Sequence, residues 1–263
     1  MLHLTLRYPL IQLCSRLQLD LRGNRLGPAG AAALALGLAA NGGLTCVDVR
    51  YNRITGDGAA QLSAAVLGNL KIEMFNKIPI KEMRADSFTE LDLMWKGLCV
   101  EGGMVVAGLI PVMGSLTKLS LAWNYLKEKG TKAICEALKQ NKTLKELDLS
   151  GHTIGGEAGA KHVADMLGVN GGLTALDLSF NNLNDDSVSA VCEAIQSNKE
   201  TKLASLNMGA NSIGPVGAKS VAAMVAVTGT LMECDVSNNA MGEEGKASIL
   251  SAAQGKAGFN LHL

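Results

Sequence analysis

The amino-acid sequence predicts an α/β solenoid, a stack of similar strand-and-helix units that together form one elongated domain. Two observations support this fold class. One phrase recurs along the chain, as LTCVDVRYNRI at 44–54, LTKLSLAWNYL at 116–126 and LTALDLSFNNL at 173–183. The phrases also return at a nearly constant interval of about 28 residues, which is typical of stacked supersecondary units.

Each phrase contains a polar position that we call the anchor, which is usually an asparagine. An asparagine amide carries donors and an acceptor, so it can satisfy the backbone where the chain turns between units. Successive anchors lie 28, 44, 28, 28, 29, 30 and 28 residues apart. The anchors are Asn24, Asn52, Lys96, Asn124, His152, Asn181, Asn211 and Asn239. Because Lys96 has no acceptor, we expect the third unit to be locally irregular.

Within each unit a short strand precedes a helix. Leu176 and Leu178 alternate, so they face one side of a strand, and Leu173 and Leu183 flank them. Glycines three residues apart then permit a tight turn, and apolar residues follow at helical spacing. One unit buries about four large aliphatic side chains, each worth ~1.5–3 kcal/mol, which cannot offset the ordering of its own backbone. The units must therefore stack.

The phrase LDLSFNNL, followed by AVCEAIQSN at 190–198, resembles a leucine-rich repeat of the long, helix-containing kind. Such repeats occur in ribonuclease inhibitor, in the Ran GTPase-activating protein and in the sensor arms of nucleotide-binding innate receptors. The resemblance extends from about Leu17 to the carboxyl terminus. It implies a curved horseshoe with a parallel β-sheet on the concave face and helices on the convex face. It does not define a function, because this scaffold hosts unrelated tasks.

We expect a single leucine-rich repeat solenoid domain over residues 1–263, with about eight full repeats. A closing strand is predicted at 259–263, where FNLHL alternates apolar and polar residues. The chain also begins almost directly in repeat register.

The interval between Asn52 and Lys96 is 16 residues too long, and the excess lies at 70–87. This segment is either a projecting loop or a truncated repeat. The strand-like spacing of Ile72 and Met74 favours the truncated repeat. The segment carries four basic residues, which form either a solvated face or a docking element. They are Lys71, Lys77, Lys81 and Arg84.

The composition argues against several classes of function. Lys and Arg together number 24, as do Asp and Glu, and aromatic residues make up 3% of the chain, so nucleic acid is not an expected partner. No apolar run approaches the length of a membrane span, and no basic leader with a cleavage site is present. The six cysteines lack CxxC pairs, which favours a reducing, cytoplasmic location. Neither a metal, a cofactor nor an enzymatic activity is predicted.

Charged residues gather on the expected concave face. Three columns between the buried strand positions contain nine acids and three bases. Asp92, Asp148 and Asp177 belong to the most regular column. Like charges on adjacent strands repel, so a selected acidic stripe suggests a partner with a basic patch. The alternative is that each aspartate simply bonds a neighbouring serine and has no binding role.

Aromatic residues form a second candidate surface. Tyr51, Trp95, Trp123 and Phe180 each come directly before an anchor, which places them in a row at the carboxyl ends of the strands. Exposed Trp and Tyr side chains are typical anchors of protein interfaces. The alternative is that these rings pack over the glycines of the neighbouring loops.

The sequence therefore predicts a non-enzymatic scaffold for protein–protein interaction that presents a rigid curved surface. The predicted protein-binding residues are Tyr51, Asp92, Trp95, Trp123, Asp148, Asp177 and Phe180. Two alternatives follow from the resemblance. One is a GTPase-activating regulator of the Ran-activator type, which would bind a small GTPase but whose long acidic tail is absent here. The other is a fragment of a receptor's sensor arm, because no nucleotide-binding domain is present.

Overall fold

In the computed structural model, which describes residues 17–151 and 154–263, short strands alternate with helices along the chain. The strands are β1 (Leu17–Asp20), β2 (Leu44–Asp48), β3 (Met74–Phe75), β4 (Glu90–Asp92), β5 (Lys118–Ser120), β6 (Glu146–Asp148), β7 (Ala175–Asp177), β8 (Ser205–Asn207), β9 (Glu233–Asp235) and β10 (Asn260–His262). The helices are α1 (Gly27–Ala40), α2 (Gly56–Gly68), α3 (Ile80–Arg84), α4 (Cys99–Leu109), the 3-10 turn η1 (Ile110–Val112), α5 (Lys127–Leu138), α6 (Gly156–Leu167), α7 (Asp185–Ser197), α8 (Pro215–Val227) and α9 (Gly242–Ala253). The anchor role predicted for His152, and the amino-terminal segment 1–16, lie outside the described residues.

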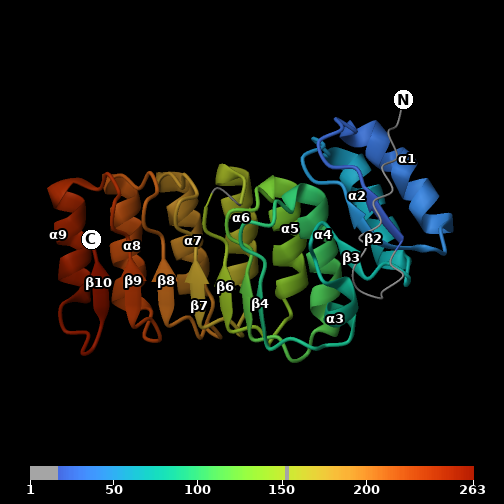
Figure 1. Ribbon diagram of the computed structural model, residues 1–263. Helices are drawn as coiled ribbons and strands as arrows, with labels where there is room; N and C mark the ends of the chain where they lie inside the picture. The colour runs from blue at the N-terminus through green and yellow to red at the C-terminus, as the bar shows by residue number, and fades with distance from the viewer. Residues whose placement is uncertain (1–16, 152–153) are drawn as a thin grey trace.

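The units stack side by side from the amino-terminal to the carboxyl-terminal end of the chain (Figure 1). Every strand pair in the described residues is parallel, and within each sheet the strands follow the order of the sequence. Helices form a second layer behind the sheet, and consecutive helices pack against one another. The solenoid is therefore the α/β leucine-rich repeat architecture that the sequence predicts.

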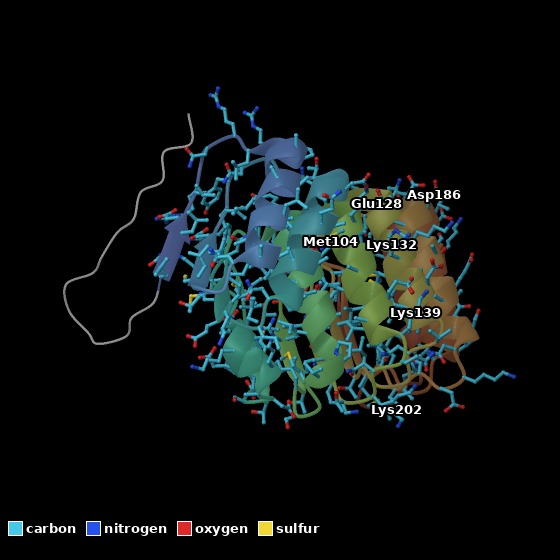
Figure 2. All side chains as sticks on the ribbon, turned by 90° about the vertical axis from the view of Figure 1, so that its right-hand side faces the viewer. Met104, Glu128, Lys132, Lys139, Asp186 and Lys202 are labelled. Atoms are coloured by element: carbon cyan, nitrogen blue, oxygen red, sulfur yellow. The ribbon has the colours of Figure 1, made fainter. Side chains whose placement is uncertain are left out.

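The outer surface of the helix layer carries charged side chains (Figure 2). The labelled residues Glu128 and Lys132 lie on α5, and Lys139 directly follows its last residue (Figure 2). Lys139 forms an ion pair with Glu136 at 2.7 Å. Exposed pairs of this kind contribute little to stability, so the helix layer is held mainly by its buried face.

The core lies between the two layers and is filled by the positions that define the repeat. Leu176, Leu178 and Leu183 are each at most 2% exposed. The helical positions Val191 and Ile195 close the same unit from the other side. Because every unit contributes an equivalent set, one continuous core runs along the solenoid.

The anchor asparagines connect each unit to the one before it. Asn124 Oδ1 accepts the backbone N–H groups of Lys96 and Leu98 at 3.0 and 3.2 Å. Its Nδ2 donates to the carbonyl oxygens of Leu93 and Leu121 at 2.7 and 3.0 Å. One buried amide therefore satisfies four backbone groups on two adjacent units, which is the role expected of the anchor.

The sheet is not continuous, which the sequence did not predict beyond a local irregularity near Lys96. In the described residues, strands β1–β3 form one sheet and strands β4–β10 form another. We call the junction between β3 and β4 the seam. The seam falls where Lys96 replaces the anchor asparagine, so it cannot supply the acceptor that Asn124 supplies one unit later. In Figure 1, β2 runs obliquely to the strands of the second sheet.

The segment 70–87 contains the short strand β3 and the five-residue helix α3, rather than a loop without regular structure. Ile72, Phe75 and Ile80 are fully buried in the common core. The chain reverses directly after β3, because Asn76 and its neighbour adopt left-handed backbone conformations and Phe75 pairs back with Ile78. The segment therefore occupies a place in the stack but does not extend to the carboxyl ends of its neighbours' strands.

One basic residue of this segment is structural, which resolves part of the choice between a solvated face and a docking element. The Arg84 guanidinium donates to the carbonyl oxygens of Leu67 and Ile72 at 2.9 and 3.0 Å. It thereby satisfies carbonyl groups at the carboxyl end of α2. Lys81 forms an ion pair with Glu73 at 3.0 Å. Lys77 and Lys71 are exposed.

At the carboxyl-terminal end, β10 pairs with β9 in parallel. Phe259 and Leu261 pack against the core, and Lys256 Nζ donates to the carbonyl oxygens of Val225 and Thr228 at 2.6 and 2.8 Å. The segment 259–263 thus adds a strand at the edge of the last repeat.

Candidate functional site

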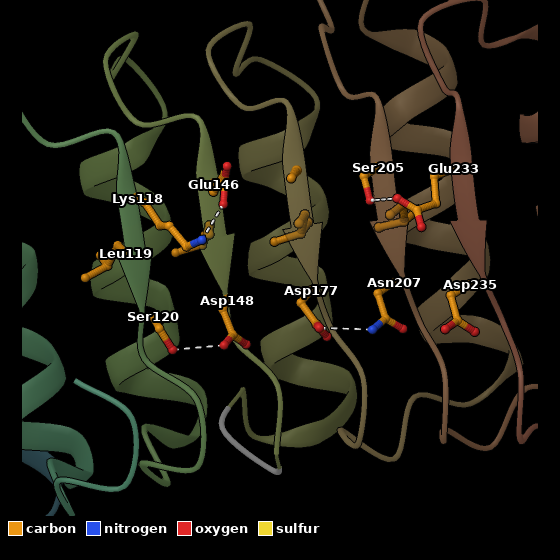
Figure 3. Close-up of a pocket in the computed structure, with 14 residues that line it drawn as sticks. Lys118, Leu119, Ser120, Glu146, Asp148, Asp177, Ser205, Asn207, Glu233 and Asp235 are labelled. Atoms are coloured by element: carbon orange, nitrogen blue, oxygen red, sulfur yellow. Dashed lines mark hydrogen bonds and ion pairs between the residues drawn. The ribbon is translucent and has the colours of Figure 1, made fainter. Parts of the chain in front are cut away.

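The outer face of the second sheet forms a groove of about 350 Å³ that is lined by side chains from β5 to β9 (Figure 3). Strands place alternate residues on this face, so the columns predicted from the sequence lie side by side. Half of the labelled residues carry carboxylates, and Lys118 is the one basic residue among them. We call this surface the concave groove.

One carboxylate oxygen of Asp148 and of Asp177 accepts hydrogen bonds from the serine two residues later. Asp148 Oδ1 accepts the backbone N–H of Ser150 at 3.0 Å. Asp177 Oδ1 accepts both the backbone N–H and the hydroxyl of Ser179, at 2.8 and 2.7 Å. These contacts fix the turn that follows each strand. The local role that the sequence offered as an alternative is therefore present at both positions.

The second carboxylate oxygen of each aspartate is also bonded. Ser120 Oγ donates to Asp148 Oδ2 at 2.9 Å, and Asn207 Nδ2 donates to Asp177 Oδ2 at 3.0 Å (Figure 3). Burial raises the pKa of Asp177, and the hydrogen bonds from Ser179 oppose this shift. Asp148 and Asp177 thus belong to a bonded polar network, although both remain on the surface of the groove.

Lys118 offsets the charge of one other acid of the groove, and a further acid is hydrogen-bonded. Lys118 and Glu146 form an ion pair at 3.0 Å, which raises the pKa of the lysine. Glu233 accepts the hydroxyl of Ser205 at 3.0 Å and lies 3.7 Å from His262 Nε2. The negative charge of the groove is therefore smaller than the number of acids suggests.

Asp92 differs from the other two predicted aspartates. Its Oδ1 accepts the N–H of Met94 at 2.8 Å, but its side chain is exposed and lies on β4, next to the seam. The structure therefore does not bring the three aspartates into one cluster. Asp148 and Asp177 lie on neighbouring strands, whereas Asp92 lies two strands away from Asp148.

The four predicted aromatic residues form a row at the carboxyl ends of the strands, which we call the aromatic ledge. Tyr51 and Trp95 are 64% and 61% exposed, Phe180 is 47% exposed and Trp123 is half-buried. Trp95 and Trp123 stack with ring centroids 4.7 Å apart and planes 6° apart. Phe180 lies tilted against Trp123 at 5.8 Å.

Each ledge residue adopts a left-handed backbone conformation, with φ between 56° and 63°. This conformation costs about 1–2 kcal/mol for a residue with a side chain. The equivalent position holds Gly23, Gly151, Ala210 and Asn238 in other repeats, so the repeat fold does not require an aromatic residue there. Strained residues that persist in this way often serve binding.

Two ledge residues also contact glycines, as the alternative interpretation of the row expected. A Cβ atom on Gly151 would overlap the Trp123 ring, so this ring packs directly on the glycine. The Tyr51 hydroxyl would lie 3.2 Å from a Cβ on Gly97. Trp123 is therefore in part a packing residue, whereas Tyr51 and Trp95 leave most of their surface exposed.

Sequence reasoning missed two residues that extend the ledge. Tyr125 is 49% exposed and has φ of 53°, and Met94 is 36% exposed beside Trp95. Tyr125 directly follows the anchor Asn124, so its position in the repeat could have identified it. Met94 lies two residues after Asp92 of β4, so the alternation of the strand places it on the same face.

Sequence reasoning also missed the residues that bridge the seam. Arg50 forms an ion pair with Asp48 at 2.6 Å and donates from Nη1 to the carbonyl oxygen of Lys96 at 3.0 Å. Asn76 Nδ2 lies 3.5 Å from Glu101 Oε1. The irregular anchor interval was the signal in the sequence, but it did not indicate which side chains would span the gap.

Glu101 is a buried carboxyl group in the first turn of α4 and is 1% exposed. Its Oε2 atom has no hydrogen-bond partner among the described residues. Burial raises the pKa of Glu101 to about 7, against smaller opposing effects from Asn76 and Lys127. This group is therefore poised to titrate near neutral pH.

The described cysteines are free thiols, and Cys14 lies outside the described residues. Burial raises the pKa of Cys135 to about 12 and also raises that of Cys192. Such thiols are unreactive and pack as small apolar residues. Within residues 17–151 and 154–263, no group of three or more His, Cys, Asp or Glu side chains is arranged to hold a metal ion.

Comparison with known proteins identifies the class. A model of the leucine-rich repeat matches residues 17–35, 44–63, 140–161, 173–192 and 199–222. The chain is 28% identical to ribonuclease inhibitor of Sus scrofa over 90% of its own length. It is a leucine-rich repeat protein of the ribonuclease-inhibitor-like kind.

The chain also resembles receptors that carry such repeats. It is 28% identical to NACHT, LRR and PYD domains-containing protein 12 of Mus musculus over 87% of its length. It spans 55% of the porcine inhibitor and 23% of the murine receptor, so it corresponds to part of each relative. Among solved structures, the actin-binding site 2 of leiomodin-1 aligns with 67% of the chain and 86% of its own length, at 16% identity and a TM-score of 0.46, a likeness too low to carry a functional argument.

None of the helices in the described ranges is both long and apolar enough to cross a lipid bilayer.

Proposed function

We propose that the chain is a non-enzymatic scaffold that binds another protein, with the aromatic ledge and the adjoining acids as the contact surface. The observation that carries this proposal is the ledge itself. Four aromatic residues occupy left-handed positions where glycine or asparagine would be less strained. Tyr51 and Trp95 in particular expose most of their rings, although burial would be favourable.

The binding surface is rigid because buried anchor asparagines hold the turns that carry the ledge residues. Asn52 and Asn124 are at most 1% exposed and hold the turns that carry Tyr51, Trp95 and Trp123. A partner therefore meets rings whose backbone positions are already fixed, and little ordering entropy opposes binding. Large, preorganised aromatic side chains are typical of residues that dominate binding energy.

The partner in this proposal is a protein with a basic patch. Such a patch would lie against Asp92 at the seam and against Asp148 and Asp177 in the concave groove. Because the groove aspartates are already hydrogen-bonded, we expect them to guide the orientation of the partner more than to supply affinity. The rings of the ledge would supply most of the affinity.

Two further functions follow from the class. The sensor-arm alternative is supported by the similarity to the NACHT, LRR and PYD domains-containing proteins, of which the chain covers a minor part. A GTPase-activating regulator would bind a small GTPase through the same surface. The free, buried cysteines favour a reducing, intracellular location for any of these roles.

The ledge is tested by replacing Trp95 and Trp123 together with asparagine, which tolerates left-handed backbone. We expect the double variant to keep its far-ultraviolet circular dichroism and to lose its partner. The measurement is affinity capture from the source's own lysate, quantified by mass spectrometry. A protein captured by the wild-type chain should fall at least about tenfold, the effect of losing one interface anchor.

The matched control replaces two exposed apolar residues on the helix layer, Val216→Asn with Val227→Asn, which are 63% and 66% exposed. This pair should capture the same proteins as the wild-type chain. If the tryptophan pair captures them equally well, the ledge is not the binding surface. If the tryptophan pair loses its circular dichroism, the rings are required for the fold and the proposal fails at these two positions.

A further inference from the structure

The seam leaves an unpaired strand edge in the middle of the concave face. On one side β4 pairs with β5, and within the described ranges no strand pairs with its other side. Successive residues of a strand direct their backbone N–H and C=O groups alternately to the two sides. Thr89 and Leu93 bond to the β5 side, so the backbone groups of Glu90 and Asp92 point towards the seam.

A regular junction shows what is missing at the seam. Between β5 and β6, the N–H groups of Lys145 and Glu146 donate to the carbonyl oxygen of Thr117 at 2.7 and 3.0 Å. In the part of the chain that the structure describes, no backbone–backbone hydrogen bond crosses the seam. The hydrogen bond from the Arg50 side chain to the Lys96 carbonyl oxygen replaces such a backbone bond beyond the carboxyl end of β4.

The helix layer behind the seam is closed. Helix α2 packs directly against α4, and α3 packs against the same helix. In the sheet layer, the backbone of Ile78 and Lys81 bonds to Phe75 and Glu73 and so covers the free side of β3. The edge that lacks a backbone partner in the described residues is therefore that of β4. The reason is that the repeat formed by β3 and α3 reverses at Asn76 before its strand is as long as β2.

The side chains around this edge are exposed and acidic. Glu90 and Asp92 are exposed, and β4 is more open to solvent than β7, β8 or β9. Lys118 on the neighbouring strand is already paired with Glu146. An added strand would place its side chains next to Glu90 and Asp92, where opposite charges stabilise the pair.

We propose that the free edge of β4 binds an extended segment of a partner protein as an added strand, with basic side chains against Glu90 and Asp92. Main-chain hydrogen bonds supply the affinity in such strand addition, and alternate side chains supply the specificity. The proposal deepens the proposed function and rests on it, because the segment belongs to the partner that contacts the neighbouring Trp95. It assigns to this partner an unfolded, basic stretch rather than a folded basic surface.

The openness of the edge is tested without any partner. Proline lacks a backbone N–H and is tolerated at the first residue of an edge strand. Glu90→Pro should therefore unfold at nearly the same temperature as Glu90→Ala. The matched variant Glu146→Pro removes an N–H that is bonded to Thr117, so it should unfold several degrees below Glu146→Ala. Equal losses for both prolines would show that the edge of β4 is already paired.

Binding at the edge is tested with a labelled peptide of sequence LTKLSLA, copied from residues 116–122. Its lysine lies opposite Glu90 if the peptide takes on the open edge the register that β5 has on the other side of β4. Fluorescence anisotropy should show binding to the wild-type chain and to Glu90→Gln. Affinity should fall about tenfold or more for Glu90→Pro, and for the same peptide with N-methyl groups at alternate residues, because main-chain hydrogen bonds are lost. Failure to bind the wild-type chain, or equal binding by Glu90→Pro and Glu90→Gln, would overturn the proposal.

The same assay separates this inference from the proposed function. The Trp95→Asn, Trp123→Asn pair retains the backbone of β4, so it should still bind the peptide by its main chain. Loss of peptide binding in Glu90→Pro alone supports the edge, whatever the captured proteins show about the tryptophans. If the tryptophan pair loses the captured proteins but Glu90→Pro keeps them, the ledge is a binding surface and strand addition is refuted. A short RNA that displaced the peptide would also refute a protein segment as the occupant.

Discussion

Single side chains at the seam replace the backbone hydrogen bonds that connect other repeats. Asn76 Oδ1 accepts the N–H of Val49 at 2.8 Å, a group that would otherwise bond to a longer β3. Arg50 reaches the carbonyl of Lys96 from the other sheet. Behind them, Glu101 is buried with one oxygen unpartnered in the described residues. The seam is thus held by side chains, and one of them can change its charge.

Glu101 should make stability depend on pH. Its pKa is 4.5 before burial and about 7 in the folded chain, so the folded state binds more protons between these values. The contribution of Glu101 to stability is then most favourable below pH 4.5 and becomes less favourable as pH rises through 7, by up to about 3 kcal/mol. Glu101→Gln should remove this fall. Urea unfolding at pH 5 and pH 8 measures it.

The control for this prediction is Glu157→Gln, because Glu157 is an exposed acid in the first turn of α6. Its pH dependence should match that of the wild-type chain. Identical unfolding curves for the wild-type chain and Glu101→Gln at both pH values would show that Glu101 does not titrate on unfolding.

Among the elements, the short helix α3 stands where other repeats have helices of 11 to 14 residues. It cannot cover the end of α2, and Arg84 compensates by donating to carbonyl groups there. Its guanidinium is partly buried, which lowers its pKa. The element is therefore small but fixed to its neighbour by a charged hydrogen-bond donor.

Replacing Arg84 with methionine should destabilise the chain by about 2 kcal/mol, because carbonyl groups at the end of α2 lose a charged donor while apolar packing is kept. Thermal unfolding measures the change. Lys71→Met, at an exposed position in the same segment, should have little effect. A stability loss as small as that of Lys71→Met would mean that water replaces Arg84 at these carbonyls.

Across the whole molecule, the anchors form a ladder whose strength depends on position. An interior anchor such as Asn124 bonds to two repeats and is fully buried. Asn24, in the first described repeat, is exposed and bonds through its amide to Leu21 and Arg22 of its own repeat. The stability of a solenoid is approximately a sum over contacts between neighbouring repeats. Anchor asparagines at different positions therefore contribute different amounts to the free energy of unfolding.

Alanine substitutions should reveal this difference. Asn124→Ala should cost about 3 kcal/mol or more, because several buried backbone groups lose their partner together. Asn24→Ala should cost less than about 1 kcal/mol, because water reaches the groups that it leaves. Urea unfolding midpoints compare the two. Similar losses at both positions would contradict a ladder that strengthens towards the interior.

The architecture could be predicted from the sequence because each repeat contains the same set of residues that form the core. Leu176 and Leu178 alternate, Asn181 follows at a fixed interval, and the helix stripe comes next, so local pattern and tertiary packing agree. The row of aromatic residues could be predicted for the same reason, since its place is set by the anchor. The sequence could not predict that Trp95 is exposed and Trp123 is packed, because this difference depends on which ring lies over Gly151.

The sequence by itself determined the stacked units, their order and the columns of side chains that face the groove, because a repeating pattern allows only one way to bury its leucines. The tertiary structure alone decided that the sheet breaks at the seam. That break depends on how far β3 extends before Asn76 turns the chain, and on which side chains reach across to Lys96. Contacts between residues from different repeats set both, and the long interval between Asn52 and Lys96 does not indicate which contacts form.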